Sequence, residues 1–229
     1  MAQESTIYDL AYHGKSTAVK NRISDDDSLK TKVDSNGRML LHWAALGGHN
    51  DLVKDLLSMG VPVDPEDDTN MTPLILAASA GRDKVVETLI NEGANVNLQT
   101  FEGHSALQYA ASKNWLTICE KLIESGANIN ITDKRGATPL HRAASKGNIE
   151  VLKLLLEQGS RLNIDTKDVY GNTALHLACE EDRQQEARLL VTYGANIEIE
   201  NKDRKTPLDI ATPSLVRQLK AIKENTSSE

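Results

Sequence analysis

The segment ATPLHRAASKGN, residues 137–148, sets the pattern of this chain, because similar segments recur along most of its length. Its leucine, Leu140, has a counterpart in each of the others. The counterparts are Leu41, Leu74, Leu107, Leu175 and Leu208, and successive leucines lie 33, 33, 33, 35 and 33 residues apart. A fixed period of this size predicts a solenoid, in which each repeat buries its apolar face by stacking on its neighbours.

Each repeat carries the signals of two short helices and a polar loop, which we call the finger. Thr138 can cap the first helix, and Pro139 then occupies its first position, where a missing N–H costs nothing. The small pair Ala143–Ala144 lets the neighbouring helix approach closely. Apolar residues at helical spacing follow in 149–156, and Gly159 closes the second helix.

TPLHxAA at a period of 33 is the pattern of ankyrin repeats, so we predict an all-α ankyrin-repeat solenoid with short β-hairpin-like fingers. One domain over residues 1–223 is expected, with seven repeats whose first and last are degenerate caps. The repeats are expected at about 4–33, 34–66, 67–99, 100–132, 133–167, 168–200 and 201–223. Residues 224–229, with the sequence ENTSSE, are expected to be disordered.

The composition narrows the classes of function. A formal net charge of −7 argues against nonspecific binding to nucleic acid or to an anionic membrane. The absence of a long apolar run and of a secretory leader predicts neither a membrane span nor secretion. Cys119 and Cys179 lie on different repeats, which predicts reduced thiols and a cytoplasmic and nuclear location.

We expect no enzymatic activity, no cofactor and no metal. The sequence contains no Gly-rich phosphate loop, no zinc-ligand spacing and no nucleophile elbow. His42, His141 and His176 recur at one repeat position, a full repeat apart, so they cannot converge on one metal ion. We expect each of them to bridge backbone groups of its own finger and of the next.

The positions that the repeat leaves free are the finger tips and the residues after the alanine pair. These line the concave face of such a solenoid, and here basic residues occupy the centre with acidic residues toward both sides. The predicted partner-binding site comprises Arg38, Asp68, Met71, Phe101, Glu102, His104, Lys113, Lys134, Arg135, Arg142, Lys146, Tyr170, Glu180 and Glu181. Such a face suits a folded protein of complementary charge, whereas nucleic acid requires a more continuous basic stripe.

Arg142 stands at a repeat position that is apolar or aromatic elsewhere. We expect its stem to be buried and its guanidinium to emerge at the surface. An arginine at such a position costs stability unless another group pairs with it.

Residues 177–181 match LxCxE, a short motif that binds retinoblastoma-type pocket proteins. Binding through this motif requires an extended, accessible segment. Leu177 and Cys179 fall on the first helix of their repeat, in register with core positions, while Glu180 and Glu181 point outward. We therefore expect the motif to be buried in the folded chain.

Several segments outside the repeat consensus carry a closer resemblance. They are MGVPVDPEDD (59–68), AASAGRDKVVE (77–87), YAASKN (109–114), HRAASKGN (141–148), GNTALHLACEED (171–182) and IENKDRKTPL (199–208). Together they resemble the gankyrin family, which are ankyrin-repeat assembly chaperones of the proteasome regulatory particle.

The resemblance implies a partner and a mechanism. The concave face would hold the C-terminal domain of one ATPase subunit of the proteasome base and sterically delay docking on the core particle. Arg38 and Lys113 match family positions that meet acidic groups, and Asp68 and Glu181 match positions that meet basic groups. The alternative is a cell-cycle adaptor that binds a cyclin-dependent kinase, a retinoblastoma-type protein or a ubiquitin ligase. We expect a monomer.

Overall fold

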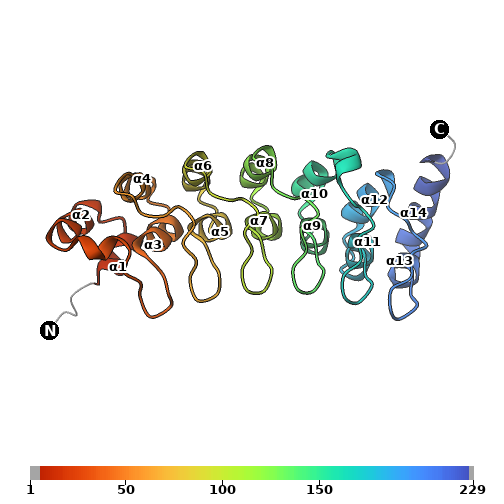
Figure 1. The fold of residues 1–229 in the computed structure, drawn as a ribbon. Helices are drawn as coiled ribbons and strands as arrows, with labels where there is room; N and C mark the ends of the chain where they lie inside the picture. The colour runs from red at the N-terminus through yellow and green to blue at the C-terminus, as the bar shows by residue number, and fades with distance from the viewer. Residues whose placement is uncertain (1–5, 227–229) are drawn as a thin grey trace. The chain divides into compact units, whose positions relative to one another are not determined.

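The computed structural model describes residues 6–226, and this range folds into paired helices joined by loops (Figure 1). The first helices of the repeats are α1 (Ile7–Tyr12), α3 (Leu40–Gly47), α5 (Pro73–Ser79), α7 (Ala106–Lys113), α9 (Pro139–Lys146), α11 (Ala174–Glu180) and α13 (Pro207–Ile210). The second helices are α2 (Ser16–Asp25), α4 (Asn50–Ser58), α6 (Asp83–Asn91), α8 (Leu116–Glu124), α10 (Ile149–Leu156), α12 (Gln184–Thr192) and α14 (Pro213–Thr226). Two 3₁₀ turns, Asp27–Lys30 and Gly159–Arg161, complete the set. The all-α prediction is confirmed.

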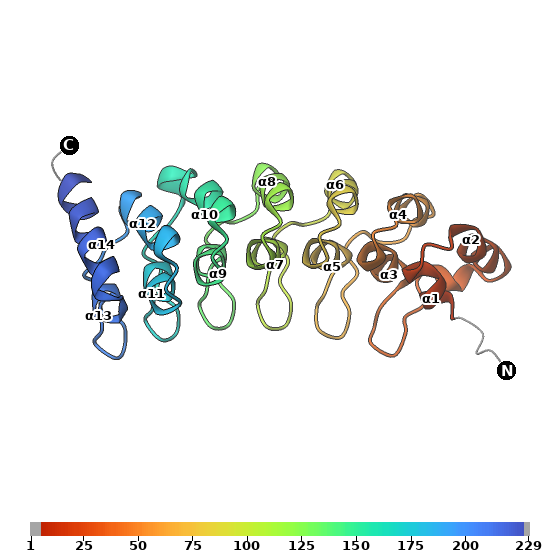
Figure 2. The ribbon, with the colours of Figure 1, turned by 180° about the vertical axis from the view of Figure 1, so that it is seen from behind.

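The chain divides into two compact units. The first runs to Tyr109 and includes Glu124–Ala127, and the second comprises Ala110–Ile123 and the chain from Asn128 onward. Within the first unit α3 packs between α1 and α5, and within the second α11 packs between α9 and α13. In both views the fingers of each unit extend from the side of the first helices (Figures 1 and 2). The expectation of one continuous domain stays a prediction.

The first helices form for the local reasons that the sequence indicates. The hydroxyl of Thr72 accepts the N–H of Ile75 at 3.2 Å, and Pro73 follows at the first helical position. The recurring leucines at 41, 74, 107, 140 and 175 are at most 1% exposed, and the alanine pairs are fully buried. Leu208 is half-buried because it lies on the shortened last repeat. Burial of these small and aliphatic side chains is the main stabilising force.

The fingers are turns held by one polar side chain each, rather than by a β-ladder. Asp34 Oδ1 accepts the backbone N–H of Asn36 at 2.8 Å and of Arg38 at 2.9 Å. Asp67, Asp133, Asp168 and Asn201 make the same pair of bonds in their own fingers. Within residues 6–226 the only bridge of β type joins Gln99 and Ser105. The expected hairpin shape is present, but side-chain acceptors take the place of strand pairing.

The C-terminal end differs from the sequence-based expectation. Residues 224–226 were expected to be disordered, but they continue α14, which Leu215 and Leu219 anchor in the core. Once a helix is anchored, each added residue contributes one hydrogen bond, so a few polar residues extend it at little cost. The remainder of the expected tail, 227–229, lies outside the described residues.

Candidate protein-binding surface

The recurring histidines bridge neighbouring fingers, as the sequence predicts. His141 Nδ1 accepts the backbone N–H of Thr138 at 3.1 Å, and its Nε2 lies 3.0 Å from the carbonyl of Asn172 in the next finger. His42 and His176 make the corresponding pair of contacts. Because Nδ1 is an acceptor, the proton resides on Nε2, which donates to the carbonyl.

This network fixes the neutral form of the ring. Burial lowers the pKa of all three histidines below 6.5, since the charged ring would lose its hydration. The carbonyls that accept from Nε2 oppose the effect but do not outweigh it. The three rings are therefore structural groups that position the fingers.

Arg38 has a role in the scaffold, and its assignment as a partner-binding residue stays a prediction. Its Nε donates to Asp67 Oδ2 at 2.8 Å, and its guanidinium carbon lies 5.1 Å from the ring centroid of Trp43. The Arg38 side chain is 21% exposed and that of Asp67 only 2%. The partner of Arg38 stands 29 residues away in the next finger, so local sequence reasoning did not find it.

Asp67 is correspondingly a structural residue that the sequence analysis missed in favour of the adjacent Asp68. Burial alone would raise the pKa of Asp67. Hydrogen bonds from Arg38, Thr69 and Met71 outweigh the burial and lower the pKa below 3.8. Asp68 is exposed at the finger tip and remains available to a partner.

Arg142 has a partner within its own finger. Its guanidinium donates to Asp133 Oδ2, while Oδ1 of the same carboxylate holds the finger. The Arg142 side chain is 30% exposed and Asp133 is 1% exposed. Trp43 makes the equivalent bond through Nε1 to Asp34 Oδ2, so this repeat position supplies a side-chain donor to the finger aspartate. Arg142 therefore has a structural role as well as a partly exposed charge.

Most of the remaining predicted site residues are exposed. They are Asp68, Phe101, Glu102, Lys113, Lys134, Arg135, Lys146, Tyr170, Glu180 and Glu181. Phe101 is 63% exposed and Tyr170 is 61% exposed, values that are high for aromatic side chains. Met71 and His104 are half-buried, and the His104 ring contacts Tyr109 edge-on at 5.4 Å.

The predicted basic centre lies entirely in the second unit. Lys113 ends α7 and Lys146 ends α9, and Asn148 Nδ2 donates to the Ala111 carbonyl, so these helix ends are neighbours. Lys134 and Arg135 occupy the finger tip that precedes α9. The expected flanking of this centre by acids spans both units and stays a prediction.

The charged residues at the carboxyl ends of the first helices differ in whether helix stability explains them. A lysine in the last turn, such as Lys113 or Lys146, is favourable because the carboxyl end of a helix carries partial negative charge. Glu180 and Glu181 stand at the carboxyl end of α11, where the same field opposes them. The stability of the helix therefore does not explain these two acids.

The LxCxE segment is inaccessible at its cysteine. Cys179 is 3% exposed, and burial raises the pKa of its thiol to about 12. It lies on α11, so the segment is helical rather than extended. Leu177 is half-buried, which corrects its placement in the core, although Leu76 at the same repeat position is only 3% exposed.

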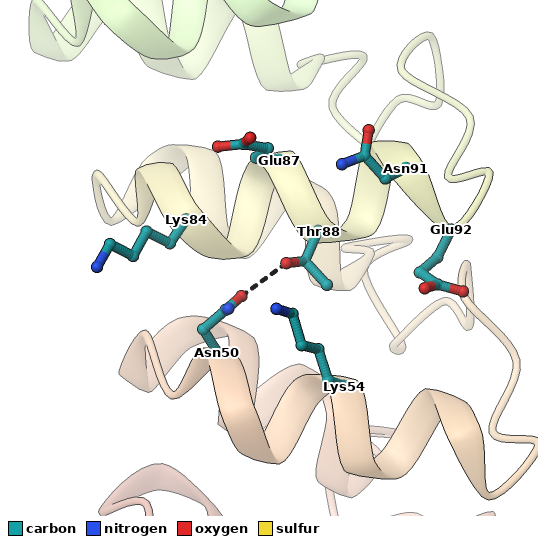
Figure 3. A pocket seen from close by; sticks show the side chains of 7 residues that line it. All are labelled: Asn50, Lys54, Lys84, Glu87, Thr88, Asn91 and Glu92. Carbon is teal, nitrogen blue, oxygen red and sulfur yellow. Dashed lines mark hydrogen bonds between the residues drawn. The ribbon is translucent and has the colours of Figure 1, made fainter.

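A polar groove of about 360 Å³ lies between α4 and α6 in the first unit (Figure 3). The hydroxyl of Thr88 donates to Asn50 Oδ1 at 2.8 Å across its floor. Lys54 reaches toward Thr88, whereas Lys84, Glu87 and Glu92 point in other directions (Figure 3). Because its charged groups do not converge, the groove resembles a contact between repeats more than a ligand site.

Metal sites and membrane spans were also sought among the described residues. Residues 6–226 contain no group of three or more His, Cys, Asp or Glu side chains placed to hold a metal ion. None of the helices in that range is long and apolar enough to cross a membrane.

Comparison with known families decides the fold family. The model described as ankyrin repeats (3 copies) matches residues 7–100 and 85–168, and one described as ankyrin repeats (many copies) matches 155–211. The chain belongs to the ankyrin-repeat family. Among solved structures, this ankyrin-repeat protein is similar to the human ASB11 ankyrin repeat domain, with a TM-score of 0.82 and 28% identity. That match covers 96% of this chain and 98% of the other.

The ankyrin repeat domain of Bcl-3 gives a TM-score of 0.83 at 22% identity over 96% of this chain and all of that one, a likeness of fold alone. Over 67 residues this ankyrin-repeat protein is 48% identical to the 26S proteasome non-ATPase regulatory subunit 10 of Mus musculus. The Homo sapiens protein is 47% identical over the same length. The match spans 29% of this chain and less than a third of either relative. The resemblance to gankyrin, which is this subunit, is confirmed over that segment.

Proposed function

We propose that this ankyrin-repeat protein is a non-catalytic assembly chaperone of the 26S proteasome regulatory particle. It would bind the C-terminal domain of a base ATPase subunit and delay docking of that subunit on the core particle. The observation that carries the proposal is the 48% identity to regulatory subunit 10. The proposal extends that short match to the function of the whole chain.

The geometry supports protein binding by exposed side chains on a rigid scaffold. The recurrent histidines and finger aspartates are occupied in holding the repeats together, so the variable residues between them are left to face a partner. Phe101 and Tyr170 supply aromatic anchors of the type that dominates interface energies.

The charges define the partner's surface. Lys113, Lys146 and Arg135 would meet acidic groups on the ATPase domain, and Asp68 and Glu181 would meet basic ones. Such complementarity sets specificity and association rate. An interface of the usual stable size would bury on the order of 1,200–2,000 Å², enough for a bound chaperone to obstruct docking sterically. The same role would place the protein in the cytoplasm and nucleus.

The cell-cycle adaptor alternative is less well supported. Binding of a retinoblastoma-type protein through LxCxE would require Cys179 to leave the core and α11 to unfold locally. No comparable feature on the described surface favours a cyclin-dependent kinase or a ubiquitin ligase.

A capture experiment from lysate tests the proposed function, with the tagged chain as bait and mass spectrometry as readout. Recovery of ATPase base subcomplexes without core particle is the expected result. Recovery of a kinase or pocket protein in the absence of any proteasomal ATPase would overturn the proposal.

The contact itself can be tested with a purified ATPase C-terminal domain. Lys113→Glu is expected to weaken binding by about 1–3 kcal/mol, because it sets a like charge against the partner's acids. Lys153→Glu is the matched control, since Lys153 is exposed on the second helix α10, away from the fingers. Equal affinities for the two variants would remove the basic centre from the interface.

A further inference from the structure

The last three finger tips of the second unit form one continuous row. Val169 N–H donates to the carbonyl of Arg135 at 2.9 Å, and Lys202 N–H donates to the carbonyl of Tyr170 at 2.9 Å. Each tip is thereby hydrogen-bonded through its backbone to the next. We call residues 134–135, 169–170 and 202–205 the finger-tip row.

The row is rigid as well as continuous. A Cβ added to Gly136 would lie 3.1 Å from Asp168 Cα, and one added to Gly171 would lie 2.9 Å from Lys202 N. The tips thus approach closely enough to require glycine at both positions. A surface fixed in this way loses little conformational entropy when a partner binds.

The side chains of the row combine positive charge with an apolar centre. Val169 is 43% exposed and Tyr170 is 61% exposed, and basic residues lie on the tips on both sides of them. Arg135, Lys202 and Arg204 form no ion pair within residues 6–226. Asp203 is the single acid among the exposed residues of the row.

Arg204 adds an independent observation. Its φ of +59° lies in the left-handed region, which disfavours residues that carry a Cβ. The equivalent positions of the other fingers hold residues that adopt this conformation readily, namely Gly37, Asn70, Gly103, Gly136 and Gly171. An arginine in a strained, exposed turn points to a use for its side chain, because glycine would adopt the same turn without strain.

We propose that the finger-tip row binds an acidic protein segment with a central apolar side chain. Acids on the segment would pair with Arg135, Lys202 and Arg204, and its apolar residue would pack on Val169 and Tyr170. A nucleic acid fits less well, since the chain as a whole is acidic and Val169 offers no stacking face. The inference goes beyond the proposed function, because it requires no proteasomal partner.

The test uses fluorescence anisotropy with the full chain and a fluorescein-labelled peptide that has glutamates on both sides of a Leu-Phe pair. Binding that weakens as salt is added is expected, with no binding of a peptide in which lysines replace the glutamates. Arg204→Asn is expected to raise the melting temperature, as Asn70 tolerates the same conformation, and to weaken peptide binding about two- to fivefold. Tyr170→Ser should weaken binding by about fivefold or more.

Lys153→Gln, which removes one exposed charge on α10, is the control and should leave peptide affinity unchanged. The proposal is overturned if Arg204→Asn and Tyr170→Ser both bind the acidic peptide as the unaltered chain does. It is also overturned if a labelled single-stranded DNA of equal charge binds more tightly than the peptide. Arg135 and Tyr170 are shared with the proposed ATPase interface, but Lys113 lies outside the row, so the effect of Lys113→Glu on ATPase binding tests that interface separately.

Discussion

Replacement of Asp67 by alanine tests how the fingers are held. The Asp67 carboxylate is 2% exposed and accepts from Arg38 Nε at 2.8 Å, Thr69 N at 2.8 Å, Thr69 Oγ1 at 2.7 Å and Met71 N at 2.9 Å. Alanine would leave the half-buried Arg38 guanidinium without its partner and two finger amides without their acceptor.

The expected loss of stability follows from the strength of these hydrogen bonds. The charged bond from Arg38 accounts for about 1.5–3 kcal/mol. The amides of Thr69 and Met71 lie in an exposed loop that water can reach, so they add about 1 kcal/mol together. Asp67→Ala is therefore expected to lower the free energy of unfolding by about 3 kcal/mol at pH 7. Urea unfolding followed by circular dichroism measures this difference.

The adjacent residue supplies the control. Asp68 is exposed and its carboxylate accepts no hydrogen bond within residues 6–226, so Asp68→Ala should change stability by less than about 0.5 kcal/mol. The pKa of Asp67 is lowered in the folded chain, so its stabilising contribution is present above pH 3.8 and is lost as the pH falls through the folded pKa. The difference in the free energy of unfolding between Asp67→Ala and the unaltered chain should therefore decrease as the pH falls below 3.8. Equal stabilities of the two variants at pH 7 would refute the structural role of Asp67.

Three further predictions concern the scaffold. Burial lowers the pKa of His141, so its contribution to the free energy of unfolding is present above pH 6.5 and is lost on acidification. His141→Gln should keep most of the stability at pH 7, since Gln108 accepts from Ser105 N at the same repeat position. The same variant should lose less stability than the unaltered chain when urea unfolding is repeated at acidic pH. An unchanged acid slope would exclude His141 as its source. Leu152→Ala, at a fully buried position of α10, should cost about 2–5 kcal/mol in the same assay. Burial raises the thiol pKa values of Cys119 and Cys179 to about 12, so both should resist a thiol reagent at pH 8 until urea unfolds the chain. Rapid labelling of Cys179 in the native state would support binding through the LxCxE segment.

The histidine bridges are the clearest example of a structural role that the repeated sequence predicts. A residue that recurs at one repeat position meets the same backbone each time, so its role could be inferred from periodicity alone. The capped first helices and the buried leucines could be inferred in the same way. Each of these features depends on contacts within one repeat or between adjacent repeats of known register.

The site was less predictable because its residues do not repeat. Arg38 looked available to a partner, yet it pairs with an aspartate 29 residues away that occupies the next finger. Asp67 was missed although it is in register with Asp34, Asp133, Asp168 and Asn201, a recurrence that indicates a structural role, whereas Asp68 has no such counterparts and faces solvent. Such differences depend on which way a side chain points within a turn.

The sequence by itself determined the all-α repeat fold, the register of the first helices and the variable positions open to a partner, because the period of 33 is a property of the chain alone. Tertiary structure decided which charges remain available. It tied Arg38 and Arg142 to finger aspartates and left Arg204 exposed in a strained turn. The physical reason is that burial and pairing depend on the packing of adjacent fingers, which a list of residue types does not contain.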